Sequence, residues 1–350
     1  MPKFIILTLL LSGLCAPAAA NEIRVKADAP DRYTVVKGDT LWGISGRFLE
    51  HPWQWPQIWQ LNRDEIKNPH LIYPGDVILL DRTGPRLTLA SGKDSSRPTV
   101  KMSPRVRAED AAARAIPAIP PAAIEPFLTR PLVIEHDSLA QAPQIVAAEE
   151  DRFIVGAGDF AYVQGLPRDK GARWQVYREG APLVDPDTGK VLGHEALYLG
   201  EAKVARYADV STVQIVKSVQ EIHRGDRLIP ASAPTFIEYV PHEPEQPLNG
   251  RVIAAPGGVS EVGQNAVVAL NRGAADGLEI GHVLSLWRAG GSAPAGAGVY
   301  ATDKARDQRL QLPDERYGLV LVFRTFAHVS YALVMETTRP VHLLDRVQKP

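Results

Sequence analysis

Apolar and polar positions between residues 33 and 80 alternate between strand-like and helix-like patterns. Residues 33–36 predict a short strand, and the pair Gly38-Asp39 predicts the turn that ends it. Asp39 or Thr40 can cap a following helix, because Leu41, Ile44 and Phe48 recur at helical spacing. The first half of this stretch is therefore expected to be a strand followed by a helix.

A second helical pattern begins near Pro56, a residue that suits the first turn of a helix. It carries Trp55, Ile58 and Trp59 on one face, and we expect both tryptophans to fill a small core. Trp53 precedes this face and is compatible with either core packing or stacking on a sugar. Glycine and proline turns then lead into an apolar strand at 77–80, so the predicted order is strand, helix, helix, strand.

Beyond residue 143 the chain reads as short strands that repeat in order. The pattern of residues 145–148 returns at 252–255, VYREG at 176–180 resembles LWRAG at 286–290, and HRGDR at 223–227 resembles HLLDR at 342–346. We therefore predict two related β-rich units, barrel-like or sandwich-like, at 143–232 and 250–350. For His223, Asp226, His342 and Asp345 we expect a role in turn formation.

Residues 82–142 have the composition of a linker between these parts. Residues 82–107 hold seven basic residues and one acidic residue, which fits either a solvated linker or a contact with an anionic envelope polymer. Short alternating pieces such as LTL at 87–89 and TVKM at 99–102 can dock as strands, and residues 119–128 predict one short helix. The expected fold class is α+β, with a small βααβ module, a basic linker and two β-rich units.

The overall composition is that of a soluble globular protein. Hydrophobic residues make up 45% of the chain and charged residues 23%, with a formal net charge of -1. This balance excludes a global attraction for nucleic acid or for an anionic membrane.

Residues 1–20 have the pattern of a signal peptide. Lys3 precedes an apolar run from 4 to 14, and Ala18 and Ala20 have the spacing that predicts cleavage after Ala20. Export would place the mature protein in the periplasm or cell envelope without a transmembrane anchor. Cys15 is the one cysteine of the chain, and Leu14 before it disfavours lipid attachment. The mature chain would then contain no disulfide and no thiolate metal site.

Two separated blocks resemble the LysM (lysin motif) family. The first is YTV at 33–35 with KGDTLWGI at 37–44, and the second is NPHLIYPGDVI at 68–78, with Asn62 between them. They have the right order and fit within one module, at about 33–81. Asp76 stands where many LysM modules carry glutamine.

The resemblance implies a βααβ fold that binds glycans containing N-acetylglucosamine, in peptidoglycan or chitin, through a shallow groove between two loops. The export pattern favours peptidoglycan. Carried over by position, the glycan-binding residues would be Gly38, Asp39, Thr40, Leu41, Trp42, Leu71, Ile72, Tyr73, Pro74 and Gly75. Loop backbone groups beside apolar side chains suit the amide and methyl of an acetamido sugar.

Other motifs favour structural explanations. DPDTG at 185–189 resembles the start of a calcium loop but lacks its closing acid, so we expect a hairpin turn. GAGVYA at 296–301 follows a glycine-rich loop instead of a strand, which argues against a dinucleotide site. The histidines lack paired metal-ligand spacing, and His136-Asp137-Ser138 would point to alternating sides. We therefore expect no catalytic residues, no metal and no cofactor.

These observations favour a non-enzymatic envelope protein that binds peptidoglycan and presents its β-rich units to an envelope partner. The alternative is a peptidoglycan hydrolase or transpeptidase with an unrecognised catalytic domain.

Overall fold

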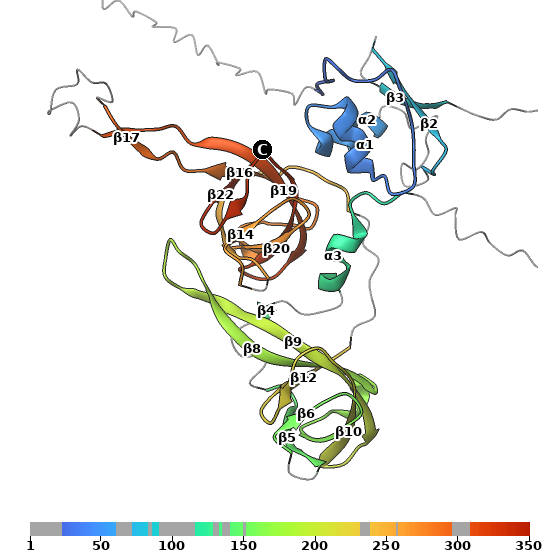
Figure 1. Ribbon diagram of the computed structural model, residues 1–350, viewed down its shortest axis with the longest axis vertical. Coiled ribbons are helices and arrows are strands. Elements are labelled where there is room, and N and C mark those ends of the chain that lie inside the picture. Colours follow the sequence, from blue (N-terminus) through green and yellow to red (C-terminus); the bar gives the residue numbers. More distant parts are fainter. Residues whose placement is uncertain are drawn as a thin grey trace, which may run out of the picture.

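The computed structural model describes ten ranges of the chain, at 23–60, 72–82, 86–90, 116–128, 133–134, 141–149, 152–231, 239–256, 258–295 and 309–350. The predicted signal peptide, Cys15, Asn62, TVKM at 99–102, His136-Asp137-Ser138 and the motif at 296–301 lie outside them. Figure 1 shows an N-terminal module, a short helix and two β-rich units in chain order.

The N-terminal module has the predicted order of elements with one additional strand. Its elements are β1 (Arg32–Thr34), α1 (Leu41–Phe48), a 3₁₀ turn (Pro52–Gln54), α2 (Trp55–Gln60), β2 (Val77–Asp81) and β3 (Arg86–Ala90). The strands form one antiparallel sheet in the order β1-β2-β3. Strand β3 contains the LTL piece of the predicted linker, so part of that linker belongs to the module.

A second part of the predicted linker forms the helix α3 (Pro121–Leu128), as expected from the sequence. Leu41, Ile44, Phe48, Trp55 and Ile78 pack in the core of the N-terminal module. The same core contains Ile116 and Ala118, from just before α3.

The first β-rich unit is a ring of six strands with one strand added to it. Its elements are β4 (Val133–Ile134), β5 (Gln144–Ala148), β6 (Ile154–Val155), β7 (Phe160–Gln164), a 3₁₀ turn (Arg168–Lys170), β8 (Arg173–Val184), β9 (Val191–Arg206), β10 (Val210–Ser218), β11 (Ile222–His223) and β12 (Arg227–Pro230). The order β10-β7-β5-β12-β8-β9 closes through a β9–β10 pairing, and β4 lies beside β9.

The second β-rich unit is a closed six-stranded barrel. Its elements are β13 (Asn249–Ala254), β14 (Glu261–Val262), β15 (Val267–Leu270), a 3₁₀ turn (Ala274–Asp276), β16 (Val283–Arg288), β17 (Ser292–Pro294), β18 (Arg309–Gln311), β19 (Glu315–Thr325), β20 (Ser330–Thr337), β21 (Val341–His342) and β22 (Arg346–Gln348). Its ring order is β13-β15-β20-β19-β16-β22. If the six ring strands of each unit are numbered by their order along the chain, the two units have the same ring order.

Both β-rich units hold an arginine–aspartate pair at corresponding places. Arg178 donates from Nε and Nη2 to Asp226, each at 2.8 Å, and Asp226 also accepts from the backbone N–H of His223. Arg288 donates in the same way to Asp345, which accepts from the backbone N–H of His342. The aspartates therefore stabilise the turns before β12 and β22, as the sequence predicted.

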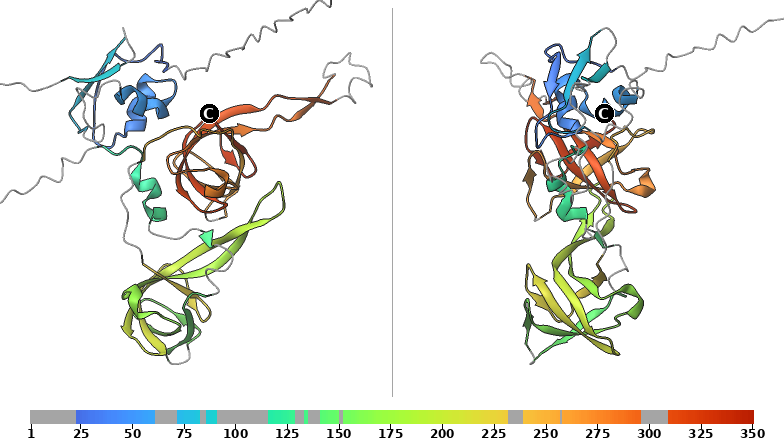
Figure 2. Two further views of the ribbon diagram at one scale, coloured as in Figure 1. Left: turned by 180° about the vertical axis from the view of Figure 1, so that it is seen from behind. Right: turned by 90° about the vertical axis from the view of Figure 1, so that its right-hand side faces the viewer.

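The outer face of the second barrel is covered by other parts of the chain. In β20 the residues from Ser330 to Met335 are all buried, whereas buried and less buried residues alternate in β7. Leu321, Phe323 and Leu333 pack outside the ring with Ile124 of α3 and with Leu183 of the β8–β9 hairpin. Figure 2 shows this hairpin reaching toward the second barrel.

Polar contacts hold the tip of the β8–β9 hairpin against the second barrel. Asp185 is buried and accepts from Asn271 Nδ2 at 2.6 Å and from Thr188 Oγ1 at 2.8 Å. Asp187 pairs with Arg251 at 2.8 Å. The DPDTG motif is thus a hairpin turn, as predicted, whose carboxylates also join the two β-rich units.

The fold as a whole is mostly β, with its few helices in the N-terminal module and in α3 among the described residues. The α+β class predicted for the chain as a whole is therefore not confirmed, because strands dominate outside the N-terminal module. None of the described helices is both long and apolar enough to cross a membrane.

Candidate functional site: the groove of the N-terminal module

The first loop of the candidate groove is a tight turn between β1 and α1. Gly38 has a φ of 99°, in the region that favours glycine. Asp39 Oδ2 accepts from the backbone N–H of Val36 at 2.8 Å and from the Tyr33 hydroxyl at 3.0 Å. Thr40 caps α1, because its Oγ1 accepts from the Gly43 N–H at 3.0 Å.

The second loop repeats this turn before β2. Gly75 has a φ of 101°, and Asp76 Oδ2 accepts from the backbone N–H of Tyr73 at 2.9 Å. The Gly75 N–H donates to the Val35 carbonyl at 2.8 Å, and the Val35 N–H donates to the Asp76 carbonyl at 2.8 Å. These bonds bring the two predicted loops together. The bond from the Tyr73 N–H explains the aspartate at position 76, because the Asp76 carboxylate stabilises the second turn as Asp39 stabilises the first.

A segment from outside the motif crosses the space between the loops. The N–H groups of Leu41 and Trp42 donate to the carbonyls of Pro117 and Ala118, at 3.0 and 3.1 Å. The Ile72 carbonyl accepts from the Ile116 N–H at 2.8 Å. Backbone groups of both loops are therefore bound to the chain's own residues 116–118, which sequence reasoning did not place near the groove.

Most apolar residues predicted for the groove are buried. Leu41 and Ile72 are 1% and 0% exposed, and Trp42 is also buried, whereas Tyr73 is 36% exposed. Gly38, Asp39, Thr40, Pro74 and Gly75 form the two turns, and Leu71 lies outside the described residues. Tyr73 is thus the predicted aromatic residue that offers a ring surface to an external ligand.

Comparison with known proteins agrees with this geometry. Residues 33–81 match the family model described as LysM domain. The chain carries a LysM domain. It is also similar to a protein of Bacillus subtilis (strain 168) described as "Uncharacterized protein YqbP", with 39% identity over 61 residues, which are 15% of this chain and 28% of that protein. The similarity therefore concerns a small part of both proteins. A LysM domain implies binding of peptidoglycan or other glycans that contain N-acetylglucosamine.

The tryptophans of the LysM domain pack on two sides. Trp55 lies in the domain core, as predicted, and the side chain of Trp59 lies outside the described residues. Trp42 and Trp53 are buried in the cluster that covers the second barrel. The question left open for Trp53 is therefore answered in favour of packing, because its ring joins the LysM domain to the rest of the protein.

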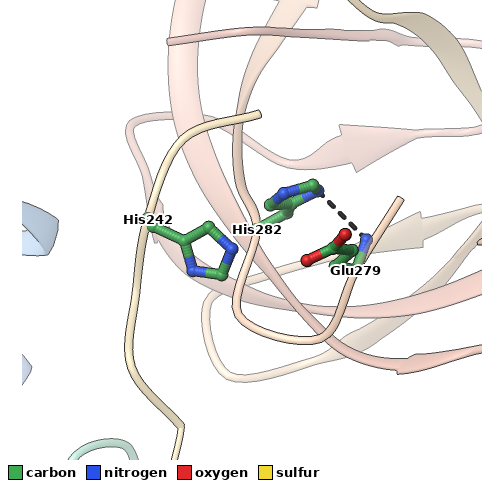
Figure 3. Close-up of side chains that lie close together, drawn as sticks. All are labelled: His242, Glu279 and His282. Carbon is green, nitrogen blue, oxygen red and sulfur yellow. Dashed lines mark hydrogen bonds between the residues drawn. The ribbon is translucent and has the colours of Figure 1, made fainter. Parts of the chain in front are cut away.

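Two histidines and a glutamate meet beside the second barrel (Figure 3). Of the described residues, His242, Glu279 and His282 form the one group able to offer ligand atoms to a metal ion, with these atoms within 4.8 Å of one another. His242 Nδ1 lies 2.9 Å from the Val240 carbonyl oxygen, which can only accept, so Nδ1 carries the hydrogen. In the neutral ring Nε2 then keeps a free lone pair. Sequence reasoning missed this group because its histidines lie far apart along the chain.

The hydrogen bonds of His282 argue against a metal site. Its Nδ1 accepts from the Glu279 backbone N–H at 3.1 Å, so the neutral ring carries its hydrogen on Nε2. A metal needs a nitrogen lone pair, and the one on Nδ1 is already used. The rings of His242 and His282 meet edge to face, with centroids 4.7 Å apart. We interpret the group as a packed pair that fixes the segment before β13 against β16.

The buried histidine predicts a pH dependence of stability. Burial, followed by the proximity of His242, lowers the pKa of His282, while Glu279 acts in the opposite direction. In the unfolded chain this histidine takes up a proton near pH 6.5, whereas in the folded protein it does so only at lower pH. The contribution of neutral His282 to the free energy of unfolding should therefore be complete above about pH 6.5 and be lost as the pH falls through the lower folded pKa. In His282→Asn, whose amide oxygen can still accept from Glu279, the melting temperature should fall less between pH 7.5 and 5.5.

Exposed His328 provides the matched control, since His328→Asn should keep the wild-type pH profile. Parallel profiles for wild type and His282→Asn would contradict the prediction.

A small arginine-lined pocket lies between the β8–β9 hairpin and the second barrel. Arg251, Arg272 and Arg346 line it together with Asp187. Arg251 pairs with Asp187, and Arg346 pairs with Asp314 at 2.6 Å. Because two of its guanidinium groups already have carboxylate partners, the pocket is best explained as part of the contact between the units.

Proposed function

We propose that this protein is a non-enzymatic component of the bacterial cell envelope that attaches to peptidoglycan through its LysM domain. The observation that carries the proposal is the pair of glycine–aspartate turns at residues 36–39 and 73–76, which hold two loops with exposed residues side by side. Amide and carbonyl groups of these loops, beside Tyr73, match the acetamido group and the ring face of N-acetylglucosamine.

The location of this function rests on the N-terminal sequence pattern. Residues 1–20 favour export and cleavage after Ala20, which would bring the LysM domain to the cell wall. One shallow groove gives at best about micromolar affinity for a short glycan, at roughly 0.3 kcal/mol per heavy atom. Retention on the wall would then depend on many glycan repeats and on other partners of the protein.

The two β-rich units are proposed to be related copies that present surfaces to an envelope protein. Supporting this relation are their common ring order and the matching pairs Arg178–Asp226 and Arg288–Asp345. Supporting a binding role are two adjacent apolar side chains, Phe153 and Ile154, which are 91% and 48% exposed.

Exchange of the exposed tyrosine tests glycan attachment. In a pulldown with purified sacculi, Tyr73→Ala should lower the bound fraction of the mature full-length protein about five- to tenfold, because one aromatic contact contributes about 1 kcal/mol. The control Leu310→Ala shortens an exposed apolar side chain outside the LysM domain and should bind like the wild type.

Equal binding by Tyr73→Ala and wild type would contradict the assignment of this groove. The non-enzymatic part of the proposal is tested in the same samples, since release of soluble muropeptides by the wild type would show a hydrolase instead.

A further inference from the structure

The LysM groove of this protein contains an irregular peptide segment of its own chain. Residues 116–118 form three backbone hydrogen bonds across it, two with the first loop at Leu41 and Trp42 and one with the second loop at Ile72. The side chains of Ile116 and Ala118 are buried in the LysM core. This segment therefore satisfies polar groups and covers apolar surface that a glycan in the same groove would need.

The chemistry of the segment resembles that of the proposed ligand. Each peptide group offers one carbonyl acceptor and, except at proline, one N–H donor, and the acetamido group of N-acetylglucosamine offers the same pair. The loop N–H groups of Leu41 and Trp42 have their hydrogen bonds directed to Pro117 and Ala118. A sugar amide could accept these bonds only after the peptide carbonyls had moved away.

We propose that residues 116–119 are an internal ligand of the LysM groove, and that glycan binding requires their displacement. This inference rests on the proposed function and adds that glycan binding is regulated by a segment of the chain itself. Few hydrogen bonds hold the segment, because Pro117 has no N–H to donate. Three backbone bonds form a contact that a multivalent glycan can replace.

The position of the segment couples the groove to the second barrel. Ile119 packs with Trp42 and with Ile124 of α3, in the cluster that covers the outer face of the barrel. Helix α3 begins at Pro121, directly after the segment, and its Phe127 carbonyl accepts from Arg324 Nη1 of β19 at 2.8 Å. Displacement by glycan therefore loosens the contact between the LysM domain and the barrel, and a partner that strengthens this contact weakens glycan binding.

Two variants of the mature full-length protein release the segment in different ways. Ile116→Ser/Ile119→Ser removes its apolar anchors, and Ile116→Pro keeps an apolar side chain but removes the N–H that donates to Ile72. Each should bind a pentamer of N-acetylglucosamine about tenfold more tightly than the wild type in calorimetry. The control Leu310→Ser/Leu312→Ser changes two exposed leucines and should bind as the wild type does.

Hydrogen exchange in the wild type measures displacement without any mutation. Saturating pentamer should speed exchange of the Ile116 amide, which loses its Ile72 acceptor, while the amides of Leu41 and Trp42 stay protected by the sugar. If wild type and released variants bind equally and Ile116 stays protected, the inference is overturned while glycan binding stands. If neither the wild type nor the variants bind the pentamer, the proposed function fails and the inference fails with it.

Discussion

Asp345→Ala should destabilise the second barrel by about 3 kcal/mol, because it removes the acceptor of a buried hydrogen-bond network. Asp345 accepts from Arg288 Nη2 at 2.9 Å, from the Tyr317 hydroxyl at 2.5 Å and from the His342 backbone N–H at 2.9 Å. Without the carboxylate, the buried Tyr317 hydroxyl and the turn before β22 lose their partner. Urea unfolding followed by tryptophan fluorescence measures the loss.

A surface pair on the same barrel provides the matched control. Asp314 pairs with Arg346, but about two-fifths of each side chain is exposed, with values of 37% and 40%. Asp314→Ala should therefore cost less than about 1 kcal/mol. If the two alanine variants lose equal stability, burial of the Asp345 network is not the cause.

The pH dependence of the Asp345 effect has a defined sign. Burial tends to raise the pKa of Asp345, but the hydrogen bonds from Arg288, Tyr317 and His342 outweigh it and hold the pKa below its ordinary value. The contribution is complete above the unfolded pKa of about 3.9 and is lost as the pH falls through the lower folded pKa. The stability difference between wild type and Asp345→Asn should thus be constant at neutral pH and shrink below about pH 4.

Phe323→Ala should cost about 3–5 kcal/mol, the range for removing a buried phenylalanine ring. Phe323 is 1% exposed although it points out of the barrel, because Phe127 of α3 packs against it with ring centroids 6.4 Å apart. The cavity would lie in the cluster that joins α3, the LysM tryptophans and the barrel. Unfolding in urea gives the magnitude, and faster exchange of the α3 amides would locate the effect.

Phe153→Ala removes the same side chain from an exposed position and should change stability by less than about 0.5 kcal/mol. A small effect of Phe323→Ala, close to that of Phe153→Ala, would show that the outer face of the barrel is not covered in solution.

Several elements could be predicted because their determinants lie within a few residues. Gly38 and Asp39 specify one turn, and Gly75 and Asp76 specify another. In each turn the glycine has a positive φ, and the aspartate side chain accepts from the backbone N–H three residues before it. The helix α3 and the strand at 87–89 were also visible as local patterns.

Other features could not be predicted because they join residues far apart in the chain. The apolar run from Gly318 to Phe323 does not reveal what covers its second face, which α3 and the LysM domain provide. The meeting of His242 with His282 depends on how a loop packs against β16. Neither contact leaves a spacing that a sequence pattern can show.

The sequence by itself determined the LysM domain and the turns that shape its groove, because these rest on hydrogen bonds between neighbouring residues. Only the tertiary structure decided what lies in that groove. Residues 116–118 reach Leu41 and Ile72 through backbone groups, which every residue carries and which leave no mark in the sequence. The domain was therefore identifiable from its residues, whereas the occupation of its groove depended on long-range packing.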